Sequence, residues 1–457
     1  MSTALAKKSF PPFPKEKHWL FGSAYLIRNS THLEVEKLIH QYGDIFSLSF
    51  PLVRLVVVAT PEYAKYVLLD NNKNYRKSLA YDMIRELLGN GLLTSEGDFW
   101  KKQRRLVQPA FHKQKLADLT AMMVNRTAQE VEKLKTKTES GEHFDVLTQM
   151  TALTLDIISE AIFSNGINDE KADLISRQIT LLNEGAKKRL DKPVRFPNWV
   201  PTLSNLRNQK AIETLDNVIY EIIDERRKSG ESKSDLLSML LDARDEETGE
   251  AMDNRQLRDE IMTIFVAGNE TTANAMAWTL YLLSQNPEAE ENMMREIDEK
   301  LDAGIALDFE NVMKFQYVRQ VIEESMRLFP PAWTVGRRAN EDDEIGGYRI
   351  IKDTNVLIPI WYFHHSEKYW DEPMKFKPER FAPEKRNSID RFVYFPFGGG
   401  PRLCIGNNFA LLEMQIILIQ LYRNFQFHLK ENFVVNPRAL ITLRPENGMM
   451  MRVEKRF

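Results

Sequence analysis

Hydrophobic residues recur every three or four positions along most of this 457-residue chain. That spacing places them on one face of an α-helix. Clear helical segments are predicted at 31–42, at 254–285 and at 409–418. The second of these is the longest, and it ends just before Pro287, which disfavours helix at the residue it follows. Helix is therefore predicted as the dominant element, with the helical period continuing to about residue 429.

A few short segments have the character of β-strands instead. Residues 45–50 and 53–59 are rich in β-branched and aromatic side chains, and Pro51 with Leu52 makes the turn between them. Similar segments follow at 348–351, 355–359, 439–443 and 449–453. The pattern predicts a mainly α fold, with small β-sheets at one side of a large helical domain.

Composition supports a single large domain over residues 1–457. Hydrophobic residues make up 43% and charged residues 28%, a globular balance that can build a large core. No internal repeat, low-complexity tract or Pro/Gly/Ser-rich linker divides the chain. Its 62 basic and 65 acidic residues nearly cancel, which gives no support for nucleic-acid binding.

The N-terminal residues 1–30 are predicted to form an extension without a membrane anchor. Residues 1–17 have few apolar side chains and are broken by Pro11, Pro12 and Pro14. No other stretch approaches the roughly 18 apolar residues that a membrane span needs. The single cysteine excludes an internal disulfide and fits a reducing compartment. We therefore expect a cytoplasmic protein with no membrane partner.

That single cysteine, Cys404, lies in the segment 397–406, which reads FGGGPRLCIG. Three glycines and a proline allow a sharply turned loop, and a helical run begins directly after it. The N–H groups and the positive end of that helix favour a thiolate, and Arg402 adds a nearby positive charge. Such a thiolate suits an axial ligand of haem iron. The alternative is a buried, chemically inert cysteine.

Polar residues also interrupt the middle of the apolar helix 254–285. The sequence there contains Gly268, Glu270 and Thr271 between apolar neighbours. Gly268 thins the helix, and a threonine hydroxyl can bond back to a backbone carbonyl and bend it. A carboxyl group next to a hydroxyl can pass protons. The alternative is a helix face that is half exposed to solvent.

Two further pairs have helical spacing. Trp100 and Arg104 share a helix face, so both can donate to one anionic group, although a basic surface helix would look the same. Glu324 and Arg327 are partners three residues apart, and most such pairs are exposed and worth little. Arg380 could reach the same carboxylate from the segment 378–381 and lock a loop to the helix.

In this order, the segments resemble the cytochrome P-450 superfamily of haem-thiolate monooxygenases, in its soluble bacterial type. The Cys404 loop matches the F-G-x-G-x-R-x-C-x-G pattern at every defined position. The acid–threonine groove matches at 267–272, the E-x-x-R pair at Glu324 and the P-E-R-F segment at 378–381. The W-x-x-x-R helix matches at Trp100. The resemblance covers nearly the whole chain.

The resemblance implies an iron protoporphyrin IX (haem b) cofactor with Cys404 as the proximal iron ligand. Phe397 would pack beside the thiolate, and Gly406 belongs to the same loop. The residues implied in binding the haem propionates are Trp100, Arg104, Arg337 and Arg402. Counting back from Gly347 favours Arg337 over Arg338.

The resemblance also assigns a catalytic pair and a structural set. Glu270 and Thr271 would deliver protons during the activation of O2. Glu324, Arg327 and Arg380 would hold the loops on the haem side together.

The implied activity inserts one oxygen atom from O2 into an organic small molecule, by C–H hydroxylation or oxidative O-demethylation. The substrate stays open between a fatty acid, a terpenoid and the methyl ether of a sugar or aryl compound. The substrate pocket would be lined by 78–92, roughly 182–203, 333–335 and 441–442, to which the groove helix adds Ile264, Phe265 and Ala267. A peroxide-driven peroxygenase, a haem-thiolate isomerase and a non-enzymatic haem sensor are the alternatives.

Electron supply is expected from separate proteins, because the chain leaves no room for a flavin or ferredoxin domain after its C-terminal hairpin. NAD(P)H would act indirectly, through a ferredoxin and its reductase or a flavodoxin-type carrier. Lys101, Lys102 and Arg105 form either a docking patch for an acidic carrier or a solvated helix face. We expect the protein to be a monomer.

Overall fold

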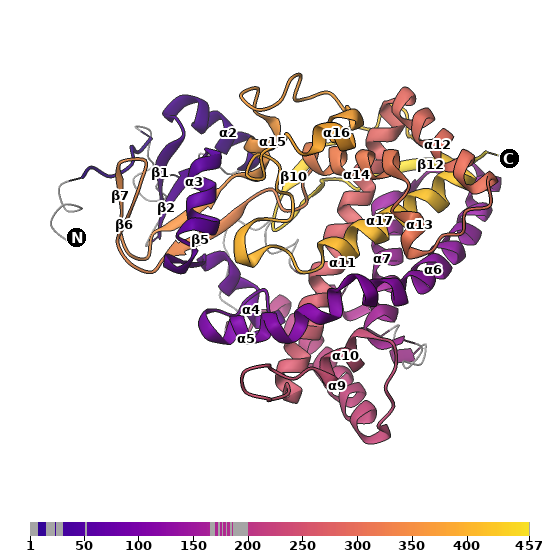
Figure 1. Cartoon of the computed structure of the whole chain (residues 1–457), viewed down its shortest axis with the longest axis horizontal. Helices are drawn as coiled ribbons and strands as arrows, with labels where there is room; N and C mark the ends of the chain where they lie inside the picture. Colours follow the sequence, from indigo (N-terminus) through magenta and orange to yellow (C-terminus); the bar gives the residue numbers. More distant parts are fainter. Residues whose placement is uncertain are drawn as a thin grey trace. The chain divides into compact units, whose positions relative to one another are not determined.

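The computed structural model describes residues 8–14, 23, 31–50, 53–164 and 200–456, and between them residues 170–171, 174–175, 177–179, 181–182 and 185. Helices dominate the described chain (Figure 1). The chain divides into two compact units. The first comprises Met1–Met83, Thr127–Met150 and Thr271–Phe457; the second comprises Ile84–Arg126 and Thr151–Glu270.

Three helices contribute residues to both units. These are α6 (Lys113–Ser140), α7 (Val146–Phe163) and α11 (Asn254–Gln285). The boundary in α11 falls between Glu270 and Thr271. The predicted catalytic pair therefore occupies adjacent positions of one continuous helix.

The first unit contains a five-stranded sheet in the order β1-β2-β8-β5-β3. Its strands are β1 (Ile45–Phe50), β2 (Val53–Val58), β8 (Asn355–Ile358), β5 (Val335–Ala339) and β3 (Tyr75–Lys77). The β1–β2 pair is antiparallel, with Ile45 opposite Val58, whereas β8 runs parallel to β2.

Strand alternation divides the side chains of this sheet between two cores. Phe46, Leu48 and Val57 pack with helix α2 (Thr31–Tyr42) on one face. Val56 and Val58 face the other side, where α3 (Pro61–Lys65) and α15 (Ile360–His365) contribute Ala64 and Phe363. Both faces are therefore covered by helix, as a period of two along each strand requires.

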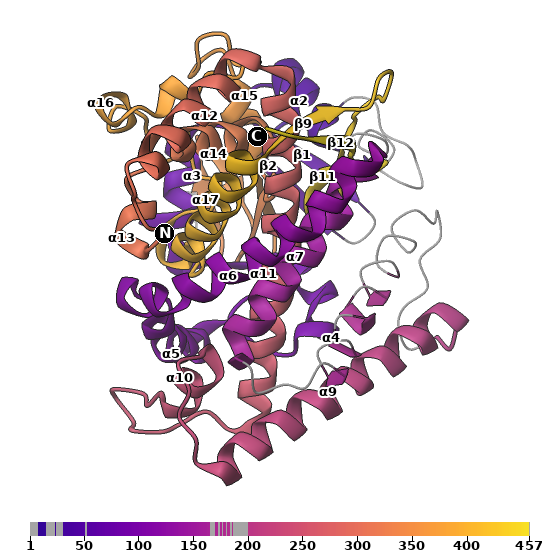
Figure 2. The ribbon, with the colours of Figure 1, turned by 90° about the vertical axis from the view of Figure 1, so that its right-hand side faces the viewer.

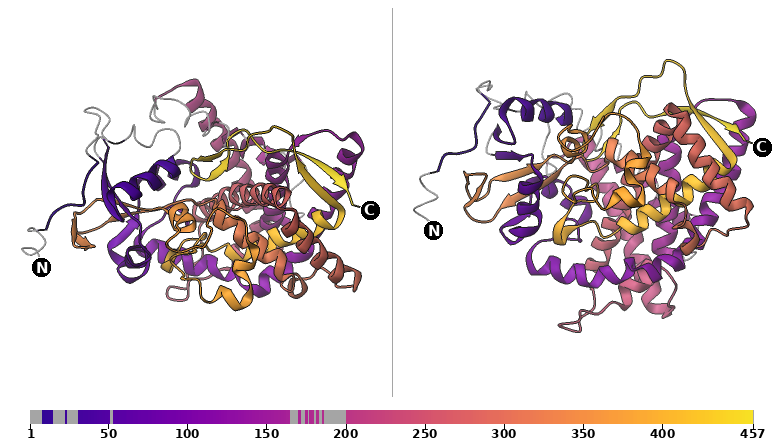
Figure 3. Two further views of the ribbon diagram at one scale, coloured as in Figure 1. Left: turned by 90° about the horizontal axis from the view of Figure 1, so that it is seen from above. Right: turned by 45° about the horizontal axis from the view of Figure 1, so that its top comes forward.

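The remaining helices of the first unit are α12 (Pro287–Asp302), α13 (Phe309–Val312), α14 (Gln316–Leu328), α16 (Pro383–Arg386) and α17 (Asn407–Asn424). Most residues of α17 are buried on every side, as in a core helix. Small sheets complete the unit: β4 (Phe144–Asp145) with β12 (Met450–Lys455) and β9 (Phe425–Leu429), the pair β10 (Pro437–Ala439) and β11 (Leu443–Pro445), and the pair β6 (Asp343–Ile345) and β7 (Tyr348–Ile350). The chain ends beside the first of these sheets (Figure 3).

The second unit contains α4 (Arg85–Leu88), α5 (Gly97–Val107), α9 (Leu203–Ser229) and α10 (Leu236–Asp242), together with the first part of α11 (Figure 2). Thr202 is the N-cap of helix α9, and its side chain accepts a hydrogen bond from the N–H of Asn205. Gly230 is its C-cap, with a φ of +64° that glycine adopts readily.

The helices predicted at 31–42 and 254–285 are confirmed, as are the strands at 45–50 and near 53–59. Two of the predicted secondary-structure elements are wrong. Residues 425–429 form strand β9, because the sequence FQFHL alternates and can pair with β12. The strand predicted at 439–443 is mostly the turn that joins β10 to β11.

Helix α7 corrects the prediction that no stretch approaches the length of a membrane span. By length and composition α7 is long and apolar enough, with a mean hydropathy of 1.3, and among the described residues it is the one helix that is. However, 61% of it is buried inside the protein. A buried apolar helix is what a large core contains, so α7 is weak support for a membrane span.

Candidate functional site

Backbone hydrogen bonds within the Cys404 loop close it on itself. The N–H of Cys404 donates to the carbonyl oxygen of Phe397 at 3.0 Å. Gly398 and Gly400 have φ values of +75° and +71°, which other residues adopt only with strain. A Cβ added at Gly400 would overlap the carbonyl oxygen of Leu68. The glycines therefore give the loop both its turn and its close contact with the segment before β3.

Cys404 itself is exposed. It lies two residues ahead of Gly406, the N-cap position of α17. The dipole at this end of an 18-residue helix favours a thiolate. Arg402 and Phe397 are partly buried in the same loop. An accessible sulfur among N–H donors, with an arginine nearby, fits the proximal side of a haem with anionic propionates.

Strand β5 separates the two candidate arginines to opposite faces. Arg338 forms an ion pair with Asp353 at 3.0 Å and is partly exposed. Arg337 is 5% exposed, and its guanidinium donates to the carbonyl oxygen of Gly336 at 3.0 Å. Arg338 is neutralised by a carboxylate, and Arg337 stays the predicted candidate for a propionate.

The middle of α11 differs from the rest of the helix in its exposure. Residues 257–265 and most of those from 272 onward are buried, whereas 266–268, Glu270 and Thr271 are partly or fully exposed. Ala267 is exposed although apolar residues precede it. The acid and the hydroxyl thus lie in an uncovered stretch of an otherwise core helix, as a proton relay beside a ligand requires.

Within the second unit, α7 supports this stretch of α11. Asn269 is buried, and its side-chain oxygen accepts a hydrogen bond from Thr154 at 2.8 Å. A Cβ added at Gly268 would lie 3.3 Å from Ile158, so the two helices are in close contact there. The structure thus gives Gly268 a packing role as well, and assigns Asn269 an anchoring role that the sequence did not suggest.

Helix α17 carries a buried acid that the sequence did not single out. Glu413 is 1% exposed and lies against Thr272 of α11. Burial raises the pKa of Glu413 well above its ordinary value, and the Thr272 hydroxyl only partly offsets this. An acidic residue between the apolar Leu412 and Met414 would have been the signal, but the sequence does not say which helix its side chain faces.

Trp100 and Arg104 lie on α5, four residues apart, both partly buried. The basic residues around them are already paired within the second unit. Lys101 pairs with Asp98, Lys102 with Glu250, and Arg105 with both Asp245 and Glu247. The solvated-face interpretation of these cations therefore has more support than a free docking patch.

The structure brings Glu324, Arg327 and Arg380 together. Glu324 and Arg327 are fully buried, and two N–H groups of Arg327 donate to the two carboxylate oxygens at 2.7 and 2.8 Å. Arg380 reaches the same carboxylate at 3.3 Å. The third guanidinium nitrogen of Arg327, Nη1, donates to the carbonyl oxygen of His364, and the backbone N–H of Lys377 donates to the Glu324 carboxylate. This network ties α14 to α15 and to the segment 375–380.

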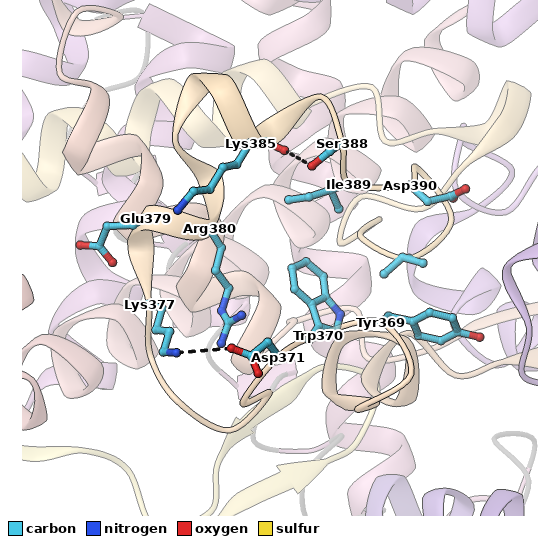
Figure 4. A pocket seen from close by; sticks show the side chains of 11 residues that line it. Tyr369, Trp370, Asp371, Lys377, Glu379, Arg380, Lys385, Ser388, Ile389 and Asp390 are labelled. Atoms are coloured by element: carbon cyan, nitrogen blue, oxygen red, sulfur yellow. Dashed lines mark hydrogen bonds and ion pairs between the residues drawn. The ribbon is translucent and has the colours of Figure 1, made fainter.

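An open pocket of about 530 Å³ lies on the first unit around Trp370 (Figure 4). Lys377, Glu379 and Arg380 contribute to its walls. All three are engaged: Lys377 with Asp371 and Glu372, Glu379 with Tyr317, and Arg380 with Glu324. The pocket contains no residue of the Cys404 loop or of α11, so it is not the candidate active site.

The predicted residues thus fall into local groups. Phe397, Arg402, Cys404 and Gly406 share one loop of the first unit, and the Glu324 network and Arg337 belong to the same unit. Trp100, Arg104 and Glu270 belong to the second unit. Most of the predicted pocket segment 182–203 lies outside the described residues.

Comparison with known proteins gives a consistent picture. The family described as Cytochrome P450 matches residues 11–451. The cyclooctat-9-en-7-ol 5-monooxygenase of Streptomyces melanosporofaciens is 34% identical over 422 residues, which cover 90% of each chain. The carotene epsilon-monooxygenase of Arabidopsis thaliana, a chloroplastic protein, is 29% identical over 462 residues, covering 95% of this chain and 84% of its own. Among solved structures, the cytochrome P450DA heme domain superposes with a TM-score of 0.89 at 27% identity, covering 98% of both chains.

Proposed function

Because this chain belongs to the cytochrome P450 family and is a mainly helical cytochrome P450 monooxygenase, we propose that it inserts one oxygen atom from O2 into a C–H bond of a largely hydrocarbon small molecule. The observation that carries the proposal is the exposed Cys404 in a glycine-shaped loop at the start of α17. Family membership supplies the reaction class, and the named residues supply the roles below.

Haem b, when bound, supplies the oxidising chemistry that no side chain can perform. Cys404 is proposed as its proximal ligand, with Phe397 packing beside the sulfur and moderating its donor strength. Arg402 and Arg337, with Trp100 and Arg104, are proposed to bind the two propionates. The Glu324–Arg327–Arg380 network ties α14 to α15 and to the segment 375–380.

Glu270 and Thr271 are proposed to move protons during the reaction. Their partial exposure in the middle of α11 leaves both able to exchange protons with water. The Asn269–Thr154 hydrogen bond holds the backbone on the buried side of this helix, within the second unit. A peroxygenase or isomerase does not need such a relay, so the pair favours an O2-dependent enzyme.

The substrate class is proposed from the relatives and from α11. The two relatives are named for reactions on a cyclic alkenol and on carotene, both built on unsaturated hydrocarbon skeletons. In this chain, the apolar residues Ile264, Phe265 and Ala267 lie three to six positions before Glu270 on α11. Of the three classes that the sequence left open, a terpenoid-like substrate fits best, and C–H hydroxylation follows as the reaction.

Electrons are proposed to come from NAD(P)H through a ferredoxin and its reductase, or through a flavodoxin-type carrier. We also propose that the protein works as a monomer in the cytoplasm.

The proposal is tested in two steps on the haem-loaded protein. First, terpenoids, fatty acids and aryl methyl ethers are titrated optically, since a substrate that displaces distal water shifts the spin state of the iron. Second, the compound that shifts it most is turned over with reductant, carrier proteins and isotopically labelled O2. One labelled oxygen atom in the product is expected. Product that forms with added peroxide but not with reductant and carrier proteins would contradict the proposal. So would a product of the reductant-driven reaction that carries no label from O2.

A further inference from the structure

Three consecutive charged residues are buried near the start of α11. Arg258, Asp259 and Glu260 are 4%, 6% and 1% exposed. Burying charges is costly unless each finds a partner. Here the partners come from two segments that are remote in sequence, the loop 89–92 and helix α9, and all of these residues belong to the second unit.

The loop docks on the two acids through its backbone. The N–H of Asn90 donates to Asp259 at 2.7 Å, and the N–H of Leu92 donates to Glu260 at 3.0 Å. Hydrogen bonds from N–H groups to a carboxylate are among the stronger ones in proteins. The loop therefore donates one hydrogen bond to each of two buried carboxylates without offering any positive side chain.

Two glycines make this docking possible. Gly89 has a φ of +63°, and a Cβ added there would overlap the carboxylate of Asp259. A Cβ at Gly91 would overlap the hydroxyl of Thr263. Thr94 closes the loop by donating to the carbonyl oxygen of Gly89 at 2.7 Å. The loop is thus internally bonded and fitted against one side of α11.

Helix α9 is attached to the same three residues through Arg258. The guanidinium donates to Asp216 of α9 at 2.7 Å through Nε, and to Asp259 at 3.0 Å through a terminal nitrogen. Asp259 is therefore shared between Arg258 and the loop, and Arg258 is shared between Asp259 and α9. Figure 2 shows α4, which ends just before the loop, together with α9 and α11.

We propose that Arg258 and Asp259 are positioning residues that couple the loop 89–92 to α9, so that the two segments leave α11 together rather than separately. If α9 withdraws Asp216, Arg258 keeps Asp259 as its one carboxylate partner. The pull of Arg258 on Asp259 then competes with the hydrogen bond to Asn90. Substrate entry would follow one joint opening, and that consequence alone rests on the proposed function.

Amide hydrogen exchange of the haem-loaded, substrate-free protein tests the coupling. In Asp216→Asn, which removes the carboxylate charge from α9, we expect exchange to accelerate around residues 212–220 and also at Asn90 and Leu92, which Asp216 does not touch. The expected acceleration at the loop is about five-fold or more, the lower end of usual coupling free energies. In Asp259→Asn, the reciprocal effect on α9 is expected.

Glu225→Gln is the matched control, because Glu225 lies on α9 like Asp216 but forms its ion pair with Lys171 instead of with Arg258. It should leave the loop amides unchanged. Acceleration in α9 without any change at Asn90 and Leu92 in the Asp216 variant would overturn the proposal. So would a uniform rise over all helices with a lower Tm, since the pair would then stabilise the fold generally. The measurement needs no substrate and no turnover, so its failure would leave the proposed reaction untouched.

Discussion

Apart from the proposed iron ligand Cys404, the proposed chemistry depends most on two residues, Glu270 and Thr271. Both are partly exposed in the middle of α11. Removing the Thr271 hydroxyl should interrupt proton delivery while leaving the fold and the Cys404 loop intact.

We expect Thr271→Ala to consume reductant at a near-normal rate but to convert it to product at least about ten-fold less efficiently, below the usual range for loss of acid–base assistance because water can substitute in part. Thr271→Ser, which keeps the hydroxyl, should restore most of the coupling. The ratio of product formed to NAD(P)H consumed measures the effect. Equal ratios in the wild type and Thr271→Ala would remove Thr271 from the relay.

His32 is a residue whose buried state has a consequence for stability. It is 1% exposed and packs edge-on against Trp361, with 4.6 Å between ring centroids. Burial lowers the pKa of His32 from 6.5 to about 4. Between these two values the unfolded chain binds a proton that the folded chain does not. Stability therefore falls as the pH is lowered through this window.

For each such histidine, the free energy of unfolding falls by about 1.4 kcal/mol for every unit by which the pH is lowered inside its window. His365 adds to the effect, because burial lowers its pKa to about 3. We expect His32→Phe to reduce the dependence of unfolding free energy on pH between 6.5 and 4 by about one proton. His40→Phe, at an exposed position of the same helix, is the control. An unchanged slope in His32→Phe, from denaturant unfolding at several pH values, would contradict the account.

Single residues also show which roles the sequence can indicate and which it cannot. Cys404 could be proposed as a ligand because its glycines, arginine and following helix are all local in sequence. Asp259 and Glu413 could not be identified in the same way. Their partners, Asn90 and Thr272, are more than a hundred residues away, and nothing in the local pattern says which segment a buried acid faces.

Among the elements, the loop before α17 makes the strictest demand on its sequence. Gly398 and Gly400 both have positive φ, but they differ in their surroundings. Open space surrounds a Cβ added at Gly398, whereas one at Gly400 would overlap the carbonyl oxygen of Leu68. The two positions therefore separate backbone strain from steric exclusion.

We expect Gly398→Ala to cost about 1–2 kcal/mol, the ordinary penalty of a left-handed residue, and to retain haem. Gly400→Ala adds a clash with backbone and should displace the loop, so that haem is lost or the thiolate signature disappears. Haem content and Tm of the two purified variants provide the comparison. Equal haem retention in both would show that the contact with Leu68 does not hold the loop in place.

Element boundaries were predictable where a periodic pattern had clear end signals. Helix 31–42 is followed by a glycine, and 254–285 is followed by Asn286 and Pro287. The segment Phe425–Leu429 lacked such a signal, and its short apolar run fits either period; pairing with β12 decides it as a strand. Tertiary pairing of this kind cannot be read from a local window.

For the whole molecule, five motifs in a fixed order indicated the family, and the family determines the mainly helical fold with its small sheets. The sequence did not indicate that the basic face of α5 is neutralised. Lys102 and Arg105 pair with the acidic segment 245–250 instead, which is remote in sequence. Charge distribution, unlike fold, depends on which loops fold back over a surface.

The claim that Cys404 holds the haem iron as a thiolate is central, and the absorption spectrum of the reduced, CO-bound protein tests it most directly. We expect the wild type to show its Soret band at the position diagnostic of thiolate ligation. In Cys404→Ser that band should be lost, whether the variant binds haem through another ligand or not at all. A Cys404→Ser protein with the same CO-bound spectrum as the wild type would contradict the assignment of the ligand and, with it, the proposed mechanism.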